Sequence, residues 1–202
     1  MPAIALDRAV SVQPTWMFVY GSIYVFVLLP LLVVRQERLL RCAMKAYLMV
    51  LIVAYAGFLA YPTIAPRPAT APTGGFAAWC LRLVYSLDSP YNCFPSLHVA
   101  HSFVSALVCY RVHRGVGFAA AVWAAIIGVS TLYTKQHFAV DIIAGALAAY
   151  AAYVLFLRGY PREIIAEVDR RRAPLRALAV TGMFGLLVAC FWLLYATKMV
   201  VA

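Results

Sequence analysis

The sequence predicts an all-α, polytopic membrane protein with six transmembrane helices, and three observations lead to this fold class. Of the 202 residues 65% are hydrophobic, well above the roughly 45–50% of soluble domains, so lipid must cover much of the surface. Charged residues make up only 12% of the chain and gather between long apolar stretches. The formal net charge of +10 is spread unevenly over the connecting loops. We expect one membrane domain over residues 1–202.

Six apolar stretches of about 20 residues are each expected to cross the bilayer as a helix. In chain order they are 16–34, 43–61, 96–112, 116–133, 138–157 and 177–196. The long loop between the second and third stretches, 62–95, is rich in proline and glycine near its ends and is therefore expected to be irregular there. Its middle, FAAWCLRLVYSL (76–87), is apolar with one arginine and predicts a short helix lying in the membrane interface.

Lysine and arginine residues indicate the orientation of these helices. Twelve lie in the loops after the first, third and fifth stretches, and five lie elsewhere. Because positively charged loops stay in the cytoplasm, we expect the long loop and both termini on the extracytoplasmic side of a bacterial inner membrane. The charge therefore needs no nucleic acid partner, and the one basic run, 170–172, lacks interleaved aromatic residues. The bilayer is the expected partner.

Polar residues from three distant regions are expected to meet at the extracytoplasmic surface: the long loop, the start of the third stretch, and the join TKQHFAVD (134–141). Within this join, Asp141 follows His137 by four residues, one helical turn or about 6 Å of rise. The carboxylate can accept a hydrogen bond from one imidazole nitrogen and leave the other as a nucleophile or base. A carboxylate in a span is costly and therefore suggests function, although Asp141 could instead cap the helix or pair with Lys135.

The other two regions supply a second histidine and groups that suit a phosphate. His98 is expected to transfer a proton, whereas His101, one turn deeper, is expected to be structural. Arg67, in the proline-stiffened APRPAT, suits a phosphate or a lipid headgroup. Ser96 precedes the first turn of the third stretch, where its hydroxyl and free backbone N–H groups can hold an oxyanion or cap the helix. Asp88 is the one further acidic residue expected on this side beyond the N-terminal tail.

Metal-free phosphoryl transfer through a phosphohistidine fits this set of residues. His137 would attack phosphorus, Asp141 would orient it, and His98 would protonate the leaving oxygen. Arg67 and its neighbours would stabilise the charge that develops on the phosphoryl oxygens. Since the sequence has no CxxC pair and no carboxylate cluster, we expect no metal site and no cofactor.

Two cysteines share the predicted outer loop. Cys80 and Cys93 would meet oxidising conditions there, and we expect a disulfide between them, with two separate buried thiols as the alternative.

These residues resemble the tripartite signature of the type 2 phosphatidic acid phosphatase superfamily, K-x6-R-P, P-S-G-H and S-R-x5-H-x3-D. The corresponding pieces are RP at 67–68, PSLH at 95–98 and STLYTKQHFAVD at 130–141. The resemblance implies a compact six-helix membrane domain whose nucleophile is the histidine of the third motif. By position, it assigns His137 and Asp141 to the third motif, Ser96 and His98 to the second, and Arg67 to the first.

Three positions depart from the signature. The lysine of the first motif falls on Ala60, the arginine of the third on Thr131, and the glycine of the second on Leu97. Two phosphate-binding cations are thus missing, and we expect Lys135, one turn from Thr131 and two residues before His137, to bind substrate with part of that charge. The variants PSLH and KQH are similar to the branch that contains inositol phosphorylceramide synthases and bacterial relatives.

Three functions are compatible with these patterns. The first is a lipid phosphatase, which acts on a membrane lipid phosphate and in which water resolves the phosphohistidine. The second is a phosphotransferase that moves a phospho-headgroup, for example phosphoinositol, to a lipid or polyol alcohol. The third is a non-catalytic transporter or scaffold, but transporter sites lie near mid-bilayer, whereas these ionisable groups gather at one interface. This location favours an enzyme over the third function. Of the two enzymes we favour the phosphatase, and analysis of the products distinguishes it from the transferase.

Overall fold

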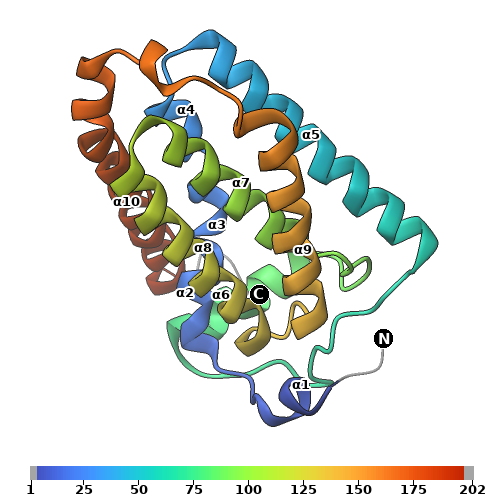
Figure 1. The fold of residues 1–202 in the computed structure, drawn as a ribbon. Coiled ribbons are helices and arrows are strands. Elements are labelled where there is room, and N and C mark those ends of the chain that lie inside the picture. Colours follow the sequence, from blue (N-terminus) through green and yellow to red (C-terminus); the bar gives the residue numbers. More distant parts are fainter. Residues whose placement is uncertain (1–3, 198–202) are drawn as a thin grey trace.

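The computed structural model describes residues 4–197, which form helices and no strand (Figure 1). The elements are α1 (Ala5–Ala9), η1 (Pro14–Trp16), α2 (Met17–Gly21), α3 (Ile23–Phe26), α4 (Leu29–Val33), α5 (Glu37–Ala60), α6 (Gly75–Leu87), α7 (Leu97–Val112), α8 (Arg114–Tyr133), α9 (Ala139–Ala152), η2 (Tyr153–Leu157), η3 (Arg162–Ile164) and α10 (Glu167–Ala196). An isolated backbone bridge pairs Ile64 with Tyr91. The all-α prediction is confirmed for this part of the chain.

Four helices are long and apolar enough to cross a membrane: α5, α8, α9 with its π-helical extension η2, and α10. This number agrees with an integral membrane protein. The first and third predicted spans form shorter helices. The third, 96–112, contains α7, which has 16 residues. Six complete spans therefore stay a prediction.

The first predicted span, 16–34, is not one helix. The chain there forms η1, α2, α3 and α4 in succession. At the first break the hydroxyl of Ser22 donates to the carbonyl of Val19 at 2.6 Å, a side-chain bond that competes with the regular helical pattern. At the second break Pro30, which has no N–H group to donate, lies in the first turn of α4. The prediction of one continuous helix was wrong, because the length of an apolar stretch does not reveal such interruptions.

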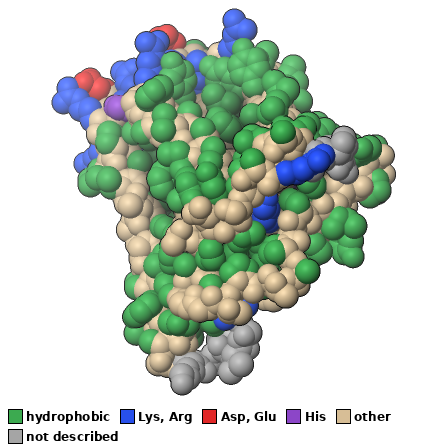
Figure 2. Space-filling view, turned by 90° about the horizontal axis from the view of Figure 1, so that it is seen from below, with side chains coloured by type: hydrophobic (Ala, Val, Ile, Leu, Met, Phe, Trp, Pro, Cys, Tyr) green, Lys and Arg blue, Asp and Glu red, His purple; other side chains and the backbone are tan. Residues whose placement is uncertain are grey.

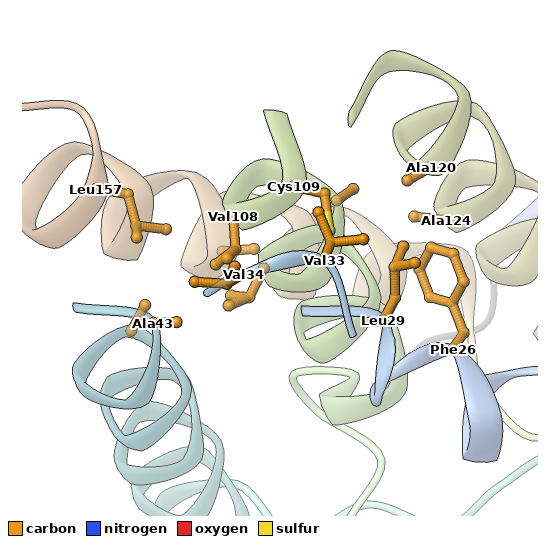
Figure 3. Packing of buried hydrophobic residues seen from close by; sticks show 14 of the residues in the cluster. Phe26, Leu29, Val33, Val34, Ala43, Val108, Cys109, Ala120, Ala124 and Leu157 are labelled. Carbon is orange, nitrogen blue, oxygen red and sulfur yellow. The ribbon is translucent and has the colours of Figure 1, made fainter. Parts of the chain in front are cut away.

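Helix α7 occupies the middle of the bundle, among α4, α5, α8 and α9 (Figure 1). Because neighbours surround it, its side chains are buried on several faces, and Val104, Val108 and Val112 are fully buried. Ala120 and Ala124 of α8 belong to the same buried cluster and lie near Phe26 and Leu29 (Figure 3). The backbones of α7 and α8 approach closely at Gly117, where a Cβ atom would lie 2.2 Å from Cα of Tyr110. This packing fixes the position of α7 and of the polar residues at its start.

The connecting loops separate into two groups at opposite ends of the bundle (Figure 1). The loops before α5, between α7 and α8, and between η2 and α10 lie together at one end, where Gln36 Nε2 donates to Asp169 Oδ2 at 2.8 Å. Segment α1, the loop 61–74 and the join 134–138 lie at the other end. Figure 2 looks onto this second end, where hydrophobic and uncharged side chains predominate. The grouping matches the loop assignment made from the charges, while the side of the membrane stays a prediction.

Helix α6 forms over Gly75–Leu87, close to the predicted 76–87. Its buried residues include Trp79, Leu81 and Val84, which pack in a cluster with Met17 and Tyr20 of α2. A helix is thus present where the sequence predicts one, and its position at the membrane interface remains a prediction.

The expected disulfide between Cys80 and Cys93 is absent, because both residues are free thiols. Cys80 belongs to the apolar cluster of α2 and α6. Cys93 lies in the loop before α7, where its thiol contacts the carbonyl of Pro90 at 3.6 Å. Burial raises the pKa of each thiol to about 11, so both remain protonated near neutral pH.

Candidate active site

The start of α7 is tied to the start of α9. Ser96 caps α7, since its hydroxyl oxygen accepts a hydrogen bond from the N–H of Val99 at 3.3 Å. The N–H of Ser96 in turn donates to the carbonyl of Asp141 at 3.0 Å. Ser96 is fully buried. The second and third sequence motifs are therefore joined through a main-chain hydrogen bond.

Two glycines allow neighbouring helices to approach this turn. A Cβ atom on Gly145 of α9 would lie 2.5 Å from the carbonyl oxygen of Ser96. A Cβ atom on Gly57 of α5 would lie 2.6 Å from Cδ of Pro95. Both distances are too short for real contacts, so each helix needs glycine at this point to support the PSLH turn.

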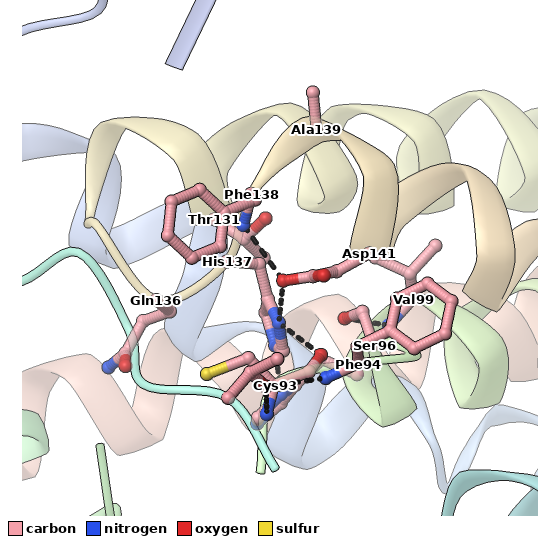
Figure 4. A network of polar contacts seen from close by, with 12 residues as sticks. Cys93, Phe94, Ser96, Val99, Thr131, Gln136, His137, Phe138, Ala139 and Asp141 are labelled. Carbon is pink, nitrogen blue, oxygen red and sulfur yellow. Dashed lines mark hydrogen bonds and ion pairs between the residues drawn. The ribbon is translucent and has the colours of Figure 1, made fainter. Parts of the chain in front are cut away.

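The two histidines meet edge to edge. Nδ1 of His98 lies 3.2 Å from Nε2 of His137, and the ring centroids are 5.5 Å apart. His137 is buried, and its Nδ1 lies 3.0 Å from the carbonyl oxygen of Cys93 and 3.4 Å from Oδ2 of Asp141 (Figure 4). Because both of these partners accept hydrogen bonds, Nδ1 carries the hydrogen. The lone pair of a neutral His137 is therefore on Nε2, the nitrogen that faces His98.

Asp141 is fully buried and has two contacts that the sequence left as alternatives. Its Oδ2 accepts a hydrogen bond from the N–H of Phe138 at 2.9 Å and caps α9, and the same oxygen faces His137 (Figure 4). Within residues 4–197, its Oδ1 has no hydrogen-bond partner. Capping and orientation of the imidazole are thus geometrically compatible.

Lys135 does not join the histidines. Its ammonium group donates to the backbone carbonyl of Asp7 at 2.8 Å. The carboxylate of Asp7, which is buried, accepts a hydrogen bond from the N–H of Ala139 at 2.8 Å. The N-terminal segment therefore covers the join before α9, and Lys135 holds it there. Asp7 is a residue that sequence reasoning did not single out.

Arg67 is held beside the join by several hydrogen bonds. Its Nε and Nη2 donate to Oε1 of Gln136 at 3.2 and 2.6 Å, and its Nη1 donates to the carbonyls of Tyr85 and Asp88, each at 3.0 Å. The guanidinium also lies over the ring of Tyr85, 4.7 Å from its centroid. These bonds use four of the five guanidinium N–H groups and leave one on Nη2. Arg67 is thus both an anchor for the loop and a source of one further donor.

Gln136, next to His137, is a site residue that the sequence analysis missed. It is buried, and its Nε2 has no hydrogen-bond partner among the described residues. Its orientation is fixed because Oε1 accepts from Arg67. A buried amide donor without a partner is costly, so Nε2 is available for an anionic ligand.

A chain of contacts extends from His98 through Tyr20 to Asp88. Nε2 of His98 lies 3.1 Å from the hydroxyl oxygen of Tyr20, which donates to Oδ2 of Asp88 at 2.8 Å. The hydroxyl of Tyr24 donates to the same carboxylate oxygen at 2.9 Å. Asp88 could be noticed in the sequence because it is the one acidic residue of the long loop. The two tyrosines lie in an apolar stretch with nothing to distinguish them.

The positions that depart from the motif contribute no charge at this site. Thr131 is fully buried, and its hydroxyl donates to the carbonyl of Gly128 at 2.7 Å. Ala60 is the last residue of α5. Within residues 4–197, no group of three or more His, Cys, Asp or Glu side chains is arranged to hold a metal ion.

Comparison with known proteins identifies the family. The model of the PAP2 superfamily matches residues 4–155, more than half of the chain. The chain belongs to the PAP2 superfamily. This is a superfamily of phosphohydrolases, and membership supports an enzyme that acts as a phosphatase or phosphotransferase.

A PA-phosphatase related-family protein of Dictyostelium discoideum is similar to this PAP2 chain, with 29% identity over 97 residues. The match covers 43% of this chain and 18% of that protein, so this chain spans only a small part of its relative. No solved structure matches the chain.

Proposed function

We propose that this PAP2 protein is an integral-membrane phosphatase that removes phosphate from a membrane lipid phosphate through a phosphohistidine on His137. One observation carries the proposal: the nitrogens of His98 and His137 lie 3.2 Å apart, with the carboxylate of Asp141 on the far edge of the His137 ring. A nucleophile with a fixed tautomer and an adjacent proton donor are the two groups that metal-free phosphoryl transfer requires.

His137 and His98 take complementary roles. Nε2 of His137 attacks phosphorus, and His98 protonates the leaving oxygen of the lipid alcohol. Attack begins at about 3–3.5 Å from the nucleophile, so substrate binding has to separate the two rings. His98 then takes a proton from water, which attacks the phosphohistidine and releases phosphate.

The phosphate is held by groups around the two rings. We propose that the free N–H of Arg67, the amide Nε2 of Gln136, and the hydroxyl of Ser96 donate to its oxygens. Ser96 uses its oxygen as an acceptor for Val99, which leaves the hydroxyl hydrogen available. Lys135 is not among these donors, because its ammonium group is bonded to the carbonyl of Asp7.

An apolar cavity of about 290 Å³ supports a lipid substrate. It lies between α2, α6 and α10 and is lined by residues such as Met17, Phe76, Val84 and Phe191. Two of the helices that line it also position groups near His98, since Tyr20 lies in α2 and Asp88 directly follows α6. We propose that it receives a hydrocarbon chain of the substrate, with the active site on the extracytoplasmic side and six membrane crossings. The two termini, 1–3 and 198–202, lie outside the described residues.

A phosphotransferase is the second candidate, and one observation favours it. The site lacks the cations of two motif positions, since Ala60 and the buried Thr131 replace them. A phosphodiester carries less charge than a monoester and needs fewer cations. An enzyme of the branch with inositol phosphorylceramide synthases would pass the phospho-headgroup to a lipid or polyol alcohol on the same histidines.

The deciding experiment uses the purified full chain in lipid vesicles with a panel of lipid phosphates and phosphodiesters. Free phosphate and new phospholipids are measured in the same reaction. Phosphate release that disappears in His137→Ala supports the phosphatase. New phospholipids without phosphate release would favour the transferase, and activity retained in His137→Ala would overturn both.

A further inference from the structure

We propose that Asp88, acting through the hydroxyl of Tyr20, is the positioning residue of His98. The pair keeps a hydrogen on Nε2 of His98 and thereby presents Nδ1 as the nitrogen that delivers the proton to the leaving oxygen. This inference rests on the proposed function and extends it to two residues outside the three sequence motifs.

The contacts form a continuous chain from α6 to the nucleophile. The carboxylate of Asp88, one residue past α6, accepts the hydrogen of Tyr20 at 2.8 Å, and the oxygen of Tyr20 lies 3.1 Å from Nε2 of His98. Nδ1 of His98 then meets Nε2 of His137, and Nδ1 of His137 meets the carbonyl of Cys93. Tyr20 is fully buried, so its hydroxyl has no bulk water as an alternative partner.

Counting hydrogens assigns the direction of each bond. The two ends of the chain, the ionised carboxylate of Asp88 and the carbonyl of Cys93, only accept. Tyr20 has one hydrogen and gives it to Asp88, so its oxygen can only accept from Nε2 of His98. His137 likewise gives the hydrogen of its Nδ1 to Cys93. The chain therefore fixes opposite tautomers on the two rings, with the hydrogen on Nε2 in His98 and on Nδ1 in His137.

The remaining contact, between the two rings, is a hydrogen bond only when the pair holds one extra proton. Placed on Nδ1 of His98, this proton leaves Nε2 of His137 free to attack, which is the reactive arrangement. Burial alone disfavours such a positive ring. The negative charge of Asp88, relayed by Tyr20, and that of a bound phosphate offset this cost.

The location of Asp88 is itself fixed by a residue of the site. Nη1 of Arg67 donates to the backbone carbonyl of Asp88 at 3.0 Å. Tyr24 donates to the same carboxylate oxygen as Tyr20, yet it has no hydrogen bond to His98 among those of the described residues. Tyr24, which is 47% exposed, therefore donates to the same carboxylate oxygen without the hydrogen bond to His98, and it controls for the loss of one hydroxyl from Asp88.

The proton transfer balances in both steps. As the N–P bond forms from Nε2 of His137, the P–O bond to the lipid breaks, and the leaving oxygen takes the proton from Nδ1 of His98. His98 is then neutral and keeps its hydrogen on Nε2. In the second step Nδ1 takes a proton from water as the water oxygen bonds to phosphorus and the N–P electrons return to His137.

The kinetic test compares substrates whose leaving groups differ in their need for a proton. Dioleoyl phosphatidic acid releases an alkoxide, which needs a general acid, whereas 4-nitrophenyl phosphate releases a stabilised phenolate, which does not. For Tyr20→Phe we expect kcat for the alkyl ester to fall by about 10- to 100-fold, part of the range of general acid catalysis, and kcat for the aryl ester to fall less than about threefold. For Tyr24→Phe the ratio of the two rates should stay near that of the native protein. An equal fall for both esters in Tyr20→Phe would mean a structural role and would overturn the proposal.

A second measurement does not depend on turnover. Nitrogen NMR of the chain, labelled at its four histidines, reports the tautomer of each ring. We expect the hydrogen of His98 on Nε2 in the native protein and in Tyr24→Phe, and a loss of this preference in Tyr20→Phe and in Asp88→Asn. A native His98 with its hydrogen on Nδ1 alone would overturn the proposal. If the tautomer is as expected but the chain hydrolyses neither ester and transfers no headgroup, the proposed function fails while the coupling of Asp88 to His98 stands.

Discussion

The two histidines of the site are held in different ways. His137 is oriented by two acceptors: the carboxylate of Asp141, four residues later, and the carbonyl of Cys93, 44 residues earlier in the loop that leads into α7. His98 is oriented from a distance, through Tyr20, 78 residues away in the sequence, and the carboxylate beyond it. The nucleophile thus depends on the joined starts of α7 and α9, whereas the proton donor depends on contacts that connect α2 to α6 and α7. Substitutions should separate the two.

Loss of the nucleophile is expected to have the largest effect. His137→Ala should lower kcat by at least about 10⁴-fold for alkyl and aryl phosphates alike, because no other group can form the covalent intermediate. Quenched reactions with labelled substrate should also show no phosphorylated protein. Substantial turnover of either ester by this variant would remove the distinction between the two histidines.

Loss of the proton donor should be smaller and selective. We expect His98→Ala to lower kcat for phosphatidic acid by about 10²–10⁴-fold and to affect 4-nitrophenyl phosphate much less. The phosphorylated protein should still form from the aryl ester. If kcat fell to the same degree for both esters, His98 would not act as a general acid, and the two histidines would not have separate roles.

The same contrast explains how much could be predicted from the sequence. The pair His137 and Asp141 can be recognised from the spacing of four residues, although only Asp141 lies in α9, which begins at Ala139, and His137 precedes the helix. The convergence of α7 and α9 also follows from the order of the apolar stretches. Tyr20 could not be recognised, because a tyrosine in an apolar stretch normally packs without a special partner.

The fold shows the same limit. Long apolar runs predict α5, α8, α9 and α10, since length and composition decide that a segment is helical in lipid. The breaks in the first stretch depend on single contacts such as that of Ser22, and the free thiols of Cys80 and Cys93 depend on which surfaces each side chain meets. Such tertiary details leave no periodic signal.

Asp141→Asn measures how much the tautomer of His137 depends on the carboxylate. We expect kcat to fall by about 10²–10³-fold, less than the roughly 10⁴-fold known for an aspartate that alone fixes a catalytic tautomer. The reason is that the carbonyl of Cys93, at 3.0 Å, holds the hydrogen on Nδ1 even without the carboxylate. Nitrogen NMR should therefore show an unchanged His137 tautomer. A tautomer exchange in this variant would show that Asp141, not Cys93, sets it.

Gly145→Ala tests the close contact between α9 and the start of α7. The added methyl group would meet the carbonyl oxygen of Ser96 at 2.5 Å, and we expect a loss of about 1–3 kcal/mol in unfolding free energy. The matched control is Gly182→Ala in α10, where no atom lies within 4 Å and alanine favours the helix by about 0.5–1 kcal/mol. Thermal unfolding in detergent measures both. A Tm for Gly145→Ala at or above that of Gly182→Ala would show that α9 and α7 can move apart freely.

Lys135→Gln is expected to have the smallest effect, and it decides between the sequence hypothesis and the geometry. The sequence suggests that Lys135 replaces the missing motif cations, but its ammonium group donates to the carbonyl of Asp7 at 2.8 Å. We therefore expect KM for phosphatidic acid to change by less than about twofold, as is usual for a partly exposed charge without a close ionic partner. Arg67→Gln removes the same charge and is the matched comparison, with KM raised by about tenfold or more because a donor to the phosphate is lost. If Lys135→Gln raised KM as much as Arg67→Gln, the lysine would have to leave Asp7 when substrate binds, and the join before α9 would bind phosphate as well as supply the nucleophile.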